Sequence, residues 1–487
     1  MLQLLLALGF LLACMFTCST PSRAQDKKPA AGVWSLQECI QYANKNNISL
    51  QQSEIQIQTT NATLQQNKLA RYAPTVNANV SQNFNWGRSI DPFTNAFVTQ
   101  RVGSNNFSLS ASVSLFNGFR TENTILQGLN TLEINRLDNE QVKQNLSLNI
   151  ALSYLNVLQN QELLKTAQIN LLSTQTQLDR TQKLFEAGAI AENEVINLKA
   201  TIANNQLAIT SAQNQVNIAK VNLQQFMNYP VEESFGIKNV EVENLSINDI
   251  AETTEQIYSL AEGSQPSVKS ADKSILSREI SIDLAKGAKY PTVNLSAVMF
   301  SGYSDATQKF ESSIVTTERV IGFVNNDPTI PVVGRFQNSI PQALPYKFLP
   351  QISDNFRQQA SIQINIPIYS AGQIRTQIGN ATLAKRNAEL QAKQVRNDLR
   401  QTIEQAYINA KNALQTYQAR QEQVKSLANA LDVNEKRYNA GASNVVDYNL
   451  AKNNLDNAKN DLVRAKYDYL FRKKVLDFYM NKPLTID

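Results

Sequence analysis

The residues of this chain best placed to do chemistry are two acids that follow glycines at a fixed distance. Glu194 lies six residues after Gly188, and Asp447 lies six residues after Gly441, in the segments LFEAGAIAENEV and RYNAGASNVVDY. Tyr438 stands three residues before the second glycine. Glycine is common where a helix ends, and an acid in the first turn of the next helix gains about 0.3 to 1 kcal/mol from the helix dipole. The two acids therefore fit helix-start positions as well as a functional site.

The residues that most often do catalysis or bind metals are scarce elsewhere. The 487 residues include no histidine, which removes the commonest general base and the commonest metal ligand. No catalytic cluster stands out, and the net charge of +5 comes without a basic cluster of the kind that binds nucleic acid. The sequence therefore predicts a protein that is not an enzyme, that uses no cofactor or metal, and that does not bind nucleic acid.

The first residues have the features of an export signal. An early apolar run is too short to span a bilayer, and Ser22-Arg23-Ala24 offers a small-x-small cleavage site, so residues 1–24 are predicted to be a signal peptide. Alternatively, the segment LLAC is a lipoprotein box in which Cys14 is acylated. Cleavage after Ala24 leaves Cys39 as the only cysteine, so the exported chain would have no internal disulfide.

The rest of the chain is predicted to consist of two copies of one unit. Pro74-Thr75-Val76-Asn77 recurs 217 residues later, whereas the alternating stretch that begins at Phe107 recurs 253 residues later. The second copy therefore has 36 extra residues between its two strands, somewhere within positions 302–355. We interpret the chain as a first repeat, a linker or equatorial segment, and a second repeat, over residues 25–230, 231–250 and 251–487.

Each copy is predicted to contain very long helices. Apolar residues recur every seven positions from Ile150 to Phe185 and, 253 residues later, from Ile403 to Tyr438, which favours coiled-coil packing. In the first copy we expect helices over Leu36 to Ala70, over Thr121 to Phe185, and onward to about Met227. Because an average globular helix has about 11 residues, these lengths predict a rod.

The segments between the helices alternate polar and apolar residues as strands do. From Thr75 to Asn85 the odd positions are polar, and residues 106–115 and 356–368 repeat the alternation. A fourth strand, from Pro291, is less strict because Val298 and Phe300 interrupt its polar face. One apolar face and one polar face fit an antiparallel sheet over a core, or a membrane barrel with water inside. We favour the barrel because no helix in the sequence has an apolar stripe wide enough to cover the sheet.

A barrel interpretation has two consequences for this chain. Four strands cannot close a barrel, and an open edge in lipid leaves costly unpaired backbone groups, so three chains would share one barrel of twelve strands. Alternation also assigns the faces of the strand at residues 106–115: lipid would lie against Leu109, Ala111 and Val113, and the lumen against Ser112.

The order and spacing of these parts resemble one family. The two-copy order of helix, strand pair, long helix and helix, the junctions LFNGF and IYSAG, and the two glycine turns resemble the TolC-type outer-membrane efflux proteins over residues 36–480. The resemblance implies an α+β membrane protein, a homotrimer with a shared twelve-stranded outer-membrane barrel and a coiled-coil helical tunnel in the periplasm. It also implies a channel that exports small molecules or proteins, with a periplasmic adaptor protein and an inner-membrane RND or ABC pump as partners.

The same resemblance gives the two glycine turns a role. Gly188 and Gly441 would form the periplasmic tips, and the gate at the tunnel entrance would include Asp447, Tyr438 and Glu194. The best-known family member has a basic residue two positions after the second glycine and another acid nine positions after it, where this chain has Ser443 and Leu450. The gate of this chain is therefore expected to have fewer ionic interactions than the gate of that family member.

One alternative belongs to a different class of protein. A coiled-coil surface protein or adhesin of the cell envelope would also use long helices. Such a fibre has no need of duplicated strand pairs and helix hairpins at matched offsets. A channel conducts ions across a lipid bilayer and a fibre does not, so conductance separates the two hypotheses.

Overall fold

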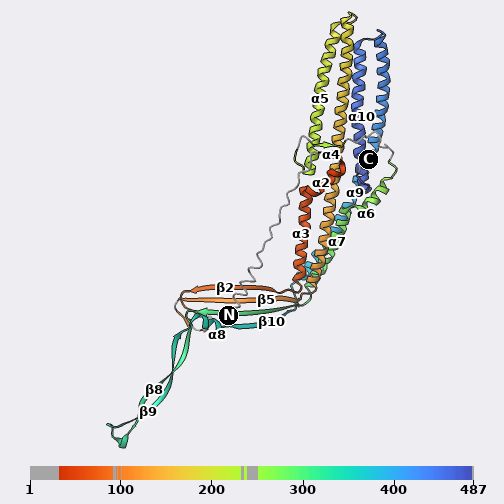
Figure 1. Ribbon diagram of the computed structural model, residues 1–487. Coiled ribbons are helices and arrows are strands. Elements are labelled where there is room, and N and C mark those ends of the chain that lie inside the picture. Colours follow the sequence, from red (N-terminus) through yellow and green to blue (C-terminus); the bar gives the residue numbers. More distant parts are fainter. Residues whose placement is uncertain are drawn as a thin grey trace.

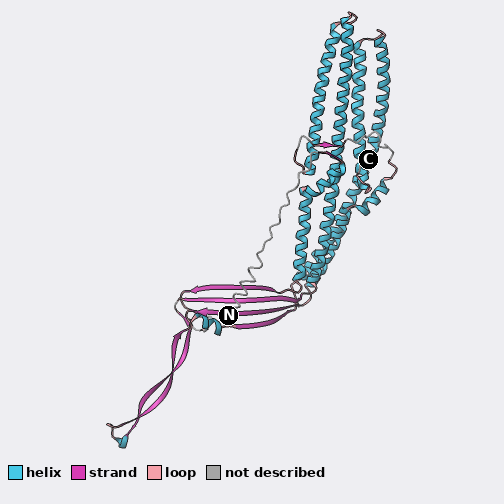
Figure 2. Ribbon diagram, viewed as in Figure 1, coloured by secondary structure: helices cyan, strands magenta, loops and turns pink. Residues whose placement is uncertain are grey.

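The computed structural model describes residues 32–90, 95, 97–99, 101–231, 235–238 and 250–484. The predicted signal peptide, the candidate lipidation site Cys14 and most of the predicted linker lie outside these residues. Figure 1 shows an elongated molecule with a tall helical bundle, a sheet that bends away from one end of it, and a hairpin that extends beyond the sheet. Helices and strands occupy largely separate parts, as Figure 2 shows, which confirms the predicted fold class.

Two helices run the length of the bundle. α4 spans Arg120–Glu186 and α9 spans Gln373–Asn439, and each has 67 residues. At about 1.5 Å per residue, each is about 100 Å long. In the half farther from the sheet, they pack against α5 (Glu192–Met227) and α10 (Val445–Tyr479). In the half nearer the sheet, they pack against α3 (Ile48–Leu69) and α7 (Pro266–Gly287).

The first helix differs from the prediction. One helix was expected from Leu36 to Ala70, but the structure has α2 (Leu36–Asn46) and α3, separated at Asn47. The backbone of Asn47 is extended, and its side-chain oxygen accepts hydrogen bonds from the N–H groups of Ser49 and Leu50 at 3.0 and 3.3 Å. Asparagine is among the best residues at this capping position, so it ends one helix and starts the next.

The second copy repeats this arrangement. α6 spans Thr254–Ser264 and is followed by α7, and the two helices have 11 and 22 residues, as α2 and α3 have. Ser35 and Thr253 cap α2 and α6 with the same reciprocal bonds, to Glu38 and Gln256 respectively. Related sequence therefore gives related helix starts and helix lengths in the two copies.

The largest core lies at mid-height in the bundle. There α2 and a two-residue parallel bridge, β1 (Val33–Trp34) with β6 (Gly236–Ile237), contribute to a core shared with α4, α5 and α10. Tyr154 of α4 is 1% exposed, and its hydroxyl donates to the carbonyl oxygens of Trp34 and Lys238 at 3.2 and 2.8 Å. These hydrogen bonds attach the bridge to the middle of α4. Cys39 of α2 is fully buried in this core.

The sheet has four antiparallel strands in the order β10-β7-β5-β2. These strands span Arg357–Asn365, Thr292–Ser304, Val102–Phe116 and Thr75–Asn85. Their register aligns apolar residues across the sheet, with Leu109 opposite Ala78 on one side and Met299 on the other. Hydroxyl groups align on the opposite face, where Thr75 and Ser112 have side-chain oxygens 2.9 Å apart. The sheet therefore has one largely apolar face and one largely polar face.

Two hairpins lie at the end of the sheet farther from the helices. The short one joins β2 to β5 and contains β3 (Ser89–Ile90) and β4 (Phe97–Val98). The long one joins β7 to β10 and contains β8 (Gln308–Phe323) and β9 (Pro331–Pro345), followed by the helix α8 (Phe348–Asp354). The 36 extra residues of the second copy thus fall in the long hairpin and α8.

The sheet meets the bundle where two backbones approach closely. Gly118 has φ +71°, and a Cβ atom there would lie 2.2 Å from the carbonyl oxygen of Gly287. The side chain of Asn117 accepts from the N–H of Thr121 at 3.2 Å and donates to its hydroxyl at 2.7 Å. The strand alternation ends at Asn117 and Gly118 because these residues turn the chain into α4.

Candidate functional site at the helix tips

The two glycine turns lie at the end of the bundle farthest from the sheet. Gly188 joins α4 to α5 and Gly441 joins α9 to α10, with φ values of +73° and +70°. Each turn has the paired hydrogen bonds of a Schellman motif; in the first, Gly188 N–H donates to Phe185 and Ala189 N–H donates to Leu184. Glycine is favoured at both positions because other residues are strained at positive φ.

A hydrogen bond connects the tips of the two copies. The hydroxyl of Tyr438, in the last turn of α9, donates to Oε2 of Glu194, in the first turn of α5, at 3.3 Å. Both side chains are half-buried. The structure therefore brings together two of the three predicted gate residues, although 244 positions separate them in the sequence.

Asp447 is placed differently, although it is equivalent to Glu194 in the repeat. Its N–H donates to the side-chain oxygen of Asn444 at 2.9 Å, and its carboxylate accepts from the hydroxyl of Ser443 at 3.1 Å. Both partners come from its own turn, and the Asp447 side chain is exposed. Within one chain Asp447 therefore has the contacts of a helix-start residue, and its carboxylate remains accessible to solvent.

Tyr448 is a member of the tip that the sequence did not single out. It is 8% exposed and stacks on Tyr438, with ring centroids 5.6 Å apart and ring planes 22° from parallel. Burial raises the pKa of both phenols, and the charge of Glu194 raises the pKa of Tyr438 further. Both hydroxyls therefore stay protonated at neutral pH, so Tyr438 remains a hydrogen-bond donor. A tyrosine ten residues after another gave no distinctive sequence signal.

A second polar cluster lies deeper between α4, α5 and α10, and the sequence did not indicate it either. The hydroxyl of Thr174 accepts from Asn205 and from the ammonium of Lys452, both at 2.9 Å. Burial lowers the pKa of Lys452 and raises the pKa of nearby Asp456. These contacts link three helices below the tip and hold the two hairpins together.

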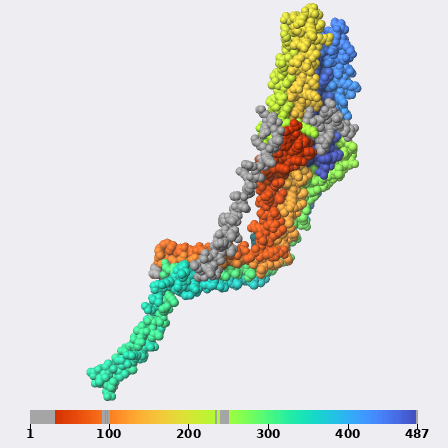
Figure 3. Space-filling view, viewed as in Figure 1, coloured from red at the N-terminus to blue at the C-terminus, as the bar shows by residue number. Residues whose placement is uncertain are grey.

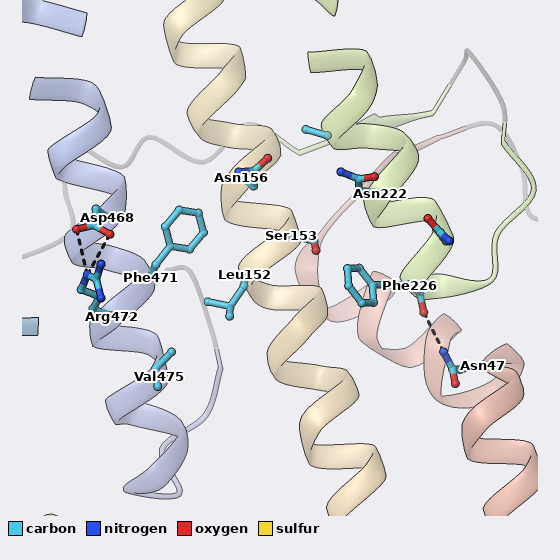
Figure 4. A pocket seen from close by; sticks show the side chains of 12 residues that line it. Asn47, Leu152, Ser153, Asn156, Asn222, Phe226, Asp468, Phe471, Arg472 and Val475 are labelled. Carbon is cyan, nitrogen blue, oxygen red and sulfur yellow. Dashed lines mark hydrogen bonds and ion pairs between the residues drawn. The ribbon is translucent and has the colours of Figure 1, made fainter. Parts of the chain in front are cut away.

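A cavity of about 900 Å³ lies at mid-height between α4, α5 and α10. Figure 4 shows the side chains that line it. Phe226 and Phe471 reach into it from either side, and amide side chains such as Asn156 and Asn222 line the rest. The charged groups in its lining are paired, because Arg472 Nε lies 3.0 Å from both carboxylate oxygens of Asp468. Apolar side chains and amides therefore share the lining, and its two charged groups neutralise each other.

In the part of the chain that the structure describes, no three acidic or cysteine side chains gather as a metal site would require. None of the helices described has both the length and the apolar character needed to cross a membrane.

Known proteins share this sequence pattern and this fold. The model of the outer membrane efflux protein family matches residues 39–229 and 257–481. The outer membrane protein TolC of Escherichia coli (strain K12) is 25% identical over 344 residues, a stretch that spans 68% of this chain and 60% of TolC. The outer membrane efflux protein BepC of Brucella suis biovar 1 is 20% identical over 428 residues, or 88% of this chain and 80% of BepC.

A solved structure is similar over nearly its whole length. The open state of the MtrE outer membrane channel of Neisseria gonorrhoeae matches with a TM-score of 0.67 and 15% identity, covering 96% of this chain and 95% of MtrE. At that identity the likeness is one of fold.

Proposed function

Because this chain belongs to the outer membrane efflux protein family, we propose that three copies of it form a channel-tunnel that exports molecules through the outer membrane. The chain is an outer-membrane protein whose helical part lies in the periplasm. In this proposal the sheets of three chains close one barrel in the membrane, and their helices enclose one tunnel that leads to it.

The observation that carries the proposal is the open sheet. Its order β10-β7-β5-β2 leaves β2 and β10 as edges, and neither pairs with a further strand among the described residues. In lipid, each unpaired N–H or C=O group costs several kcal/mol, so these edges need partners. Joining β10 of one chain to β2 of the next closes a ring, and three chains supply twelve strands with the apolar face outward.

The tips would form the gate of the tunnel. The hydrogen bond from Tyr438 to Glu194 holds the two hairpins of one chain together, which favours the closed state. Three-fold symmetry would place three exposed Asp447 carboxylates around the axis, where they would attract cations. An adaptor protein and an inner-membrane RND or ABC pump would dock at these tips, and the pump would select the cargo.

The proposal is tested by the size and the conductance of the purified protein. Light scattering in detergent should give the mass of three chains, and reconstitution into planar bilayers should give discrete channel currents. A monomer in detergent would contradict the shared barrel. A trimer without conductance under any voltage or salt condition would favour the structural-fibre hypothesis instead.

A further inference from the structure

The long hairpin β8–β9 is the part of the molecule that the proposed channel leaves unexplained. Figure 3 shows it as a slender arm that stands clear of the rest of the described chain on the face in view. Its two strands have 16 and 15 residues, and all but four of these residues are exposed. A lone two-stranded ribbon is at best marginally stable in water, so this ribbon needs a partner.

One face of the hairpin is suited to burial. It contains Phe310, Ile314 and Val320 of β8. On β9 it contains Ala343, opposite Phe310, Val333, opposite Val320, and Pro341 between them. We call it the Phe310 face. Phe310 and Ile314 are 66% and 67% exposed. The charged residues of this face, Glu318 and Arg335, lie opposite each other and form an ion pair, with Arg335 Nε 2.9 Å from Glu318 Oε1. The rest of the face is uncharged and polar, with Gln308, Ser312, Thr316, Gln337 and Ser339, so the Phe310 face is about half apolar and has one neutralised charged pair.

The opposite face carries more charge. We call it the Lys309 face; its β8 residues include Lys309, Glu311, Ser313, Val315 and Arg319, and its β9 residues include Val332, Phe336, Ile340 and Leu344. Both faces therefore offer apolar side chains, but contact through the Phe310 face would desolvate fewer charges.

The prolines of β9 disfavour another common way to cover such a ribbon. Pro341 lies inside the strand, and Pro331 and Pro345 lie at its ends. Proline has no N–H to offer, so β9 is a poor template for an added strand. β8 has no proline, but an added strand on its edge would leave the exposed apolar side chains of the faces in water, so contact through a face covers more of the ribbon.

We propose that the Phe310 faces of the three hairpins pack against one another beyond the barrel, so that the partner of each hairpin is the same hairpin of the other two chains. This inference rests on the trimer proposed above. Residues 308–345 contain three basic and three acidic residues, so like copies would not repel one another. A surface that docked on anionic lipid headgroups would instead need an excess of basic residues.

The dimensions of the molecule allow this contact. A strand of 16 residues is about 50 Å long at roughly 3.3 Å per residue. Twelve strands about 4.8 Å apart and tilted about 40° give a barrel radius of roughly 12 Å. Hairpins that rise from three points on such a rim can therefore reach one another. The β3–β4 hairpin, with strands of two residues, is too short to cover the long one.

Crosslinking of single cysteines tests the proposal. Ile314→Cys places a thiol on the Phe310 face, and Val315→Cys, its neighbour, places one on the Lys309 face. The native Cys39 should stay silent because it is fully buried and burial raises its pKa to about 12. The parent protein, treated in parallel, reports on any other native thiol. A short bis-maleimide applied to the purified full-length protein should link chains through Ile314→Cys at least ten times more than through Val315→Cys.

The outcomes separate this proposal from the proposed function. If the protein is a trimer by light scattering but Ile314→Cys gives no linked chains, or no more than Val315→Cys, the hairpin contact is wrong and the channel stands. A monomer would overturn both. Hydrogen exchange gives a second measurement: β8 amides should exchange at least tenfold more slowly in the parent than in Ile314→Asp, and equal rates would also contradict the contact.

Discussion

Replacing Tyr438 with phenylalanine should loosen the closed tunnel, because it removes one hydroxyl from the tip of each chain. That hydroxyl donates to Glu194 at 3.3 Å. Oxygen-to-oxygen hydrogen bonds are usually about 2.5 to 3.0 Å, and those to charged acceptors contribute about 1.5 to 3 kcal/mol. Because the distance is long and the site is half-exposed, we expect this bond to contribute less, about 1 kcal/mol. Three such bonds in the trimer would contribute about 3 kcal/mol.

That free energy sets the size of the effect. If the three tips open together, losing about 3 kcal/mol raises the ratio of open to closed channels roughly 150-fold. If each tip opens alone, the change is about fivefold per tip. Currents through single trimers in planar bilayers report the open fraction directly, and Tyr438→Phe should spend far more time open than the parent.

Tyr448→Phe is the matched control. Tyr448 stacks on Tyr438, but its hydroxyl makes no hydrogen bond to any other residue that the structure describes. Phenylalanine keeps the ring, so the open fraction should stay near that of the parent. If Tyr438→Phe left the ratio within about twofold of the parent, or if Tyr448→Phe changed it as much, the hydrogen bond would not be what holds the tips.

The dependence on pH provides an independent check. Burial and then the charge of Glu194 raise the pKa of Tyr438 above its ordinary value of 10.0. A raised pKa means that the bond is fully present below about pH 10 and is lost as the pH rises through the higher value. The open fraction attributable to Tyr438 should therefore be flat between about pH 7 and pH 10 and should rise only beyond that range.

Three further predictions concern other parts of the molecule. Asp447→Asn should weaken block by multivalent cations from the periplasmic side without changing the fold. Carboxylates about 10 Å apart around the axis would repel by roughly 0.4 kcal/mol per pair in water, and bound cations relieve that repulsion. Unchanged block and ion preference would mean that Asp447 is a helix-start residue only. Ala111→Arg should hinder membrane insertion by about 2 to 4 kcal/mol, whereas Ser112→Arg should not, and equal yields of folded protein in membranes would contradict our assignment of the sheet faces. Gly441→Ala should lower the thermal midpoint, because alanine at φ +70° costs about 1 to 2 kcal/mol while nothing lies within 4 Å to clash with its methyl group; an unchanged midpoint would mean that the turn rearranges.

The long helices and the sheet could be predicted because their signals are local and repeated. The predicted long helix from Thr121 to Phe185 differs by one residue at each end from α4, which spans Arg120–Glu186. Heptad spacing and an absence of proline define such a helix over many turns. Alternation over ten residues fixes strand faces equally well, and the register of β2 with β5 follows that alternation.

Features without a periodic signal were missed. The break at Asn47 needs one capping asparagine, and this chain has many asparagines within its helices, so that residue alone gave no warning. The strands β8 and β9 mix polar and apolar residues on both faces, which hid them inside the insertion. The contact between Tyr438 and Glu194 depends on how two hairpins pack, and no local pattern determines that.

The two copies of the repeat explain why Tyr438 and Glu194 form one hydrogen bond at the tip of each chain. A shift of 253 residues relates Tyr438 to Phe185 and Asp447 to Glu194. Within a chain, Tyr438 of the second copy contacts Glu194 of the first copy. In a closed ring, the equivalent contact would join the first copy of one chain to the second copy of the next chain. That counterpart would pair Phe185 with Asp447, and phenylalanine has no hydroxyl to donate. This hydrogen bond would therefore form within the chains of the proposed trimer and have no equivalent between them, so we expect its tips to separate first at the boundaries between chains.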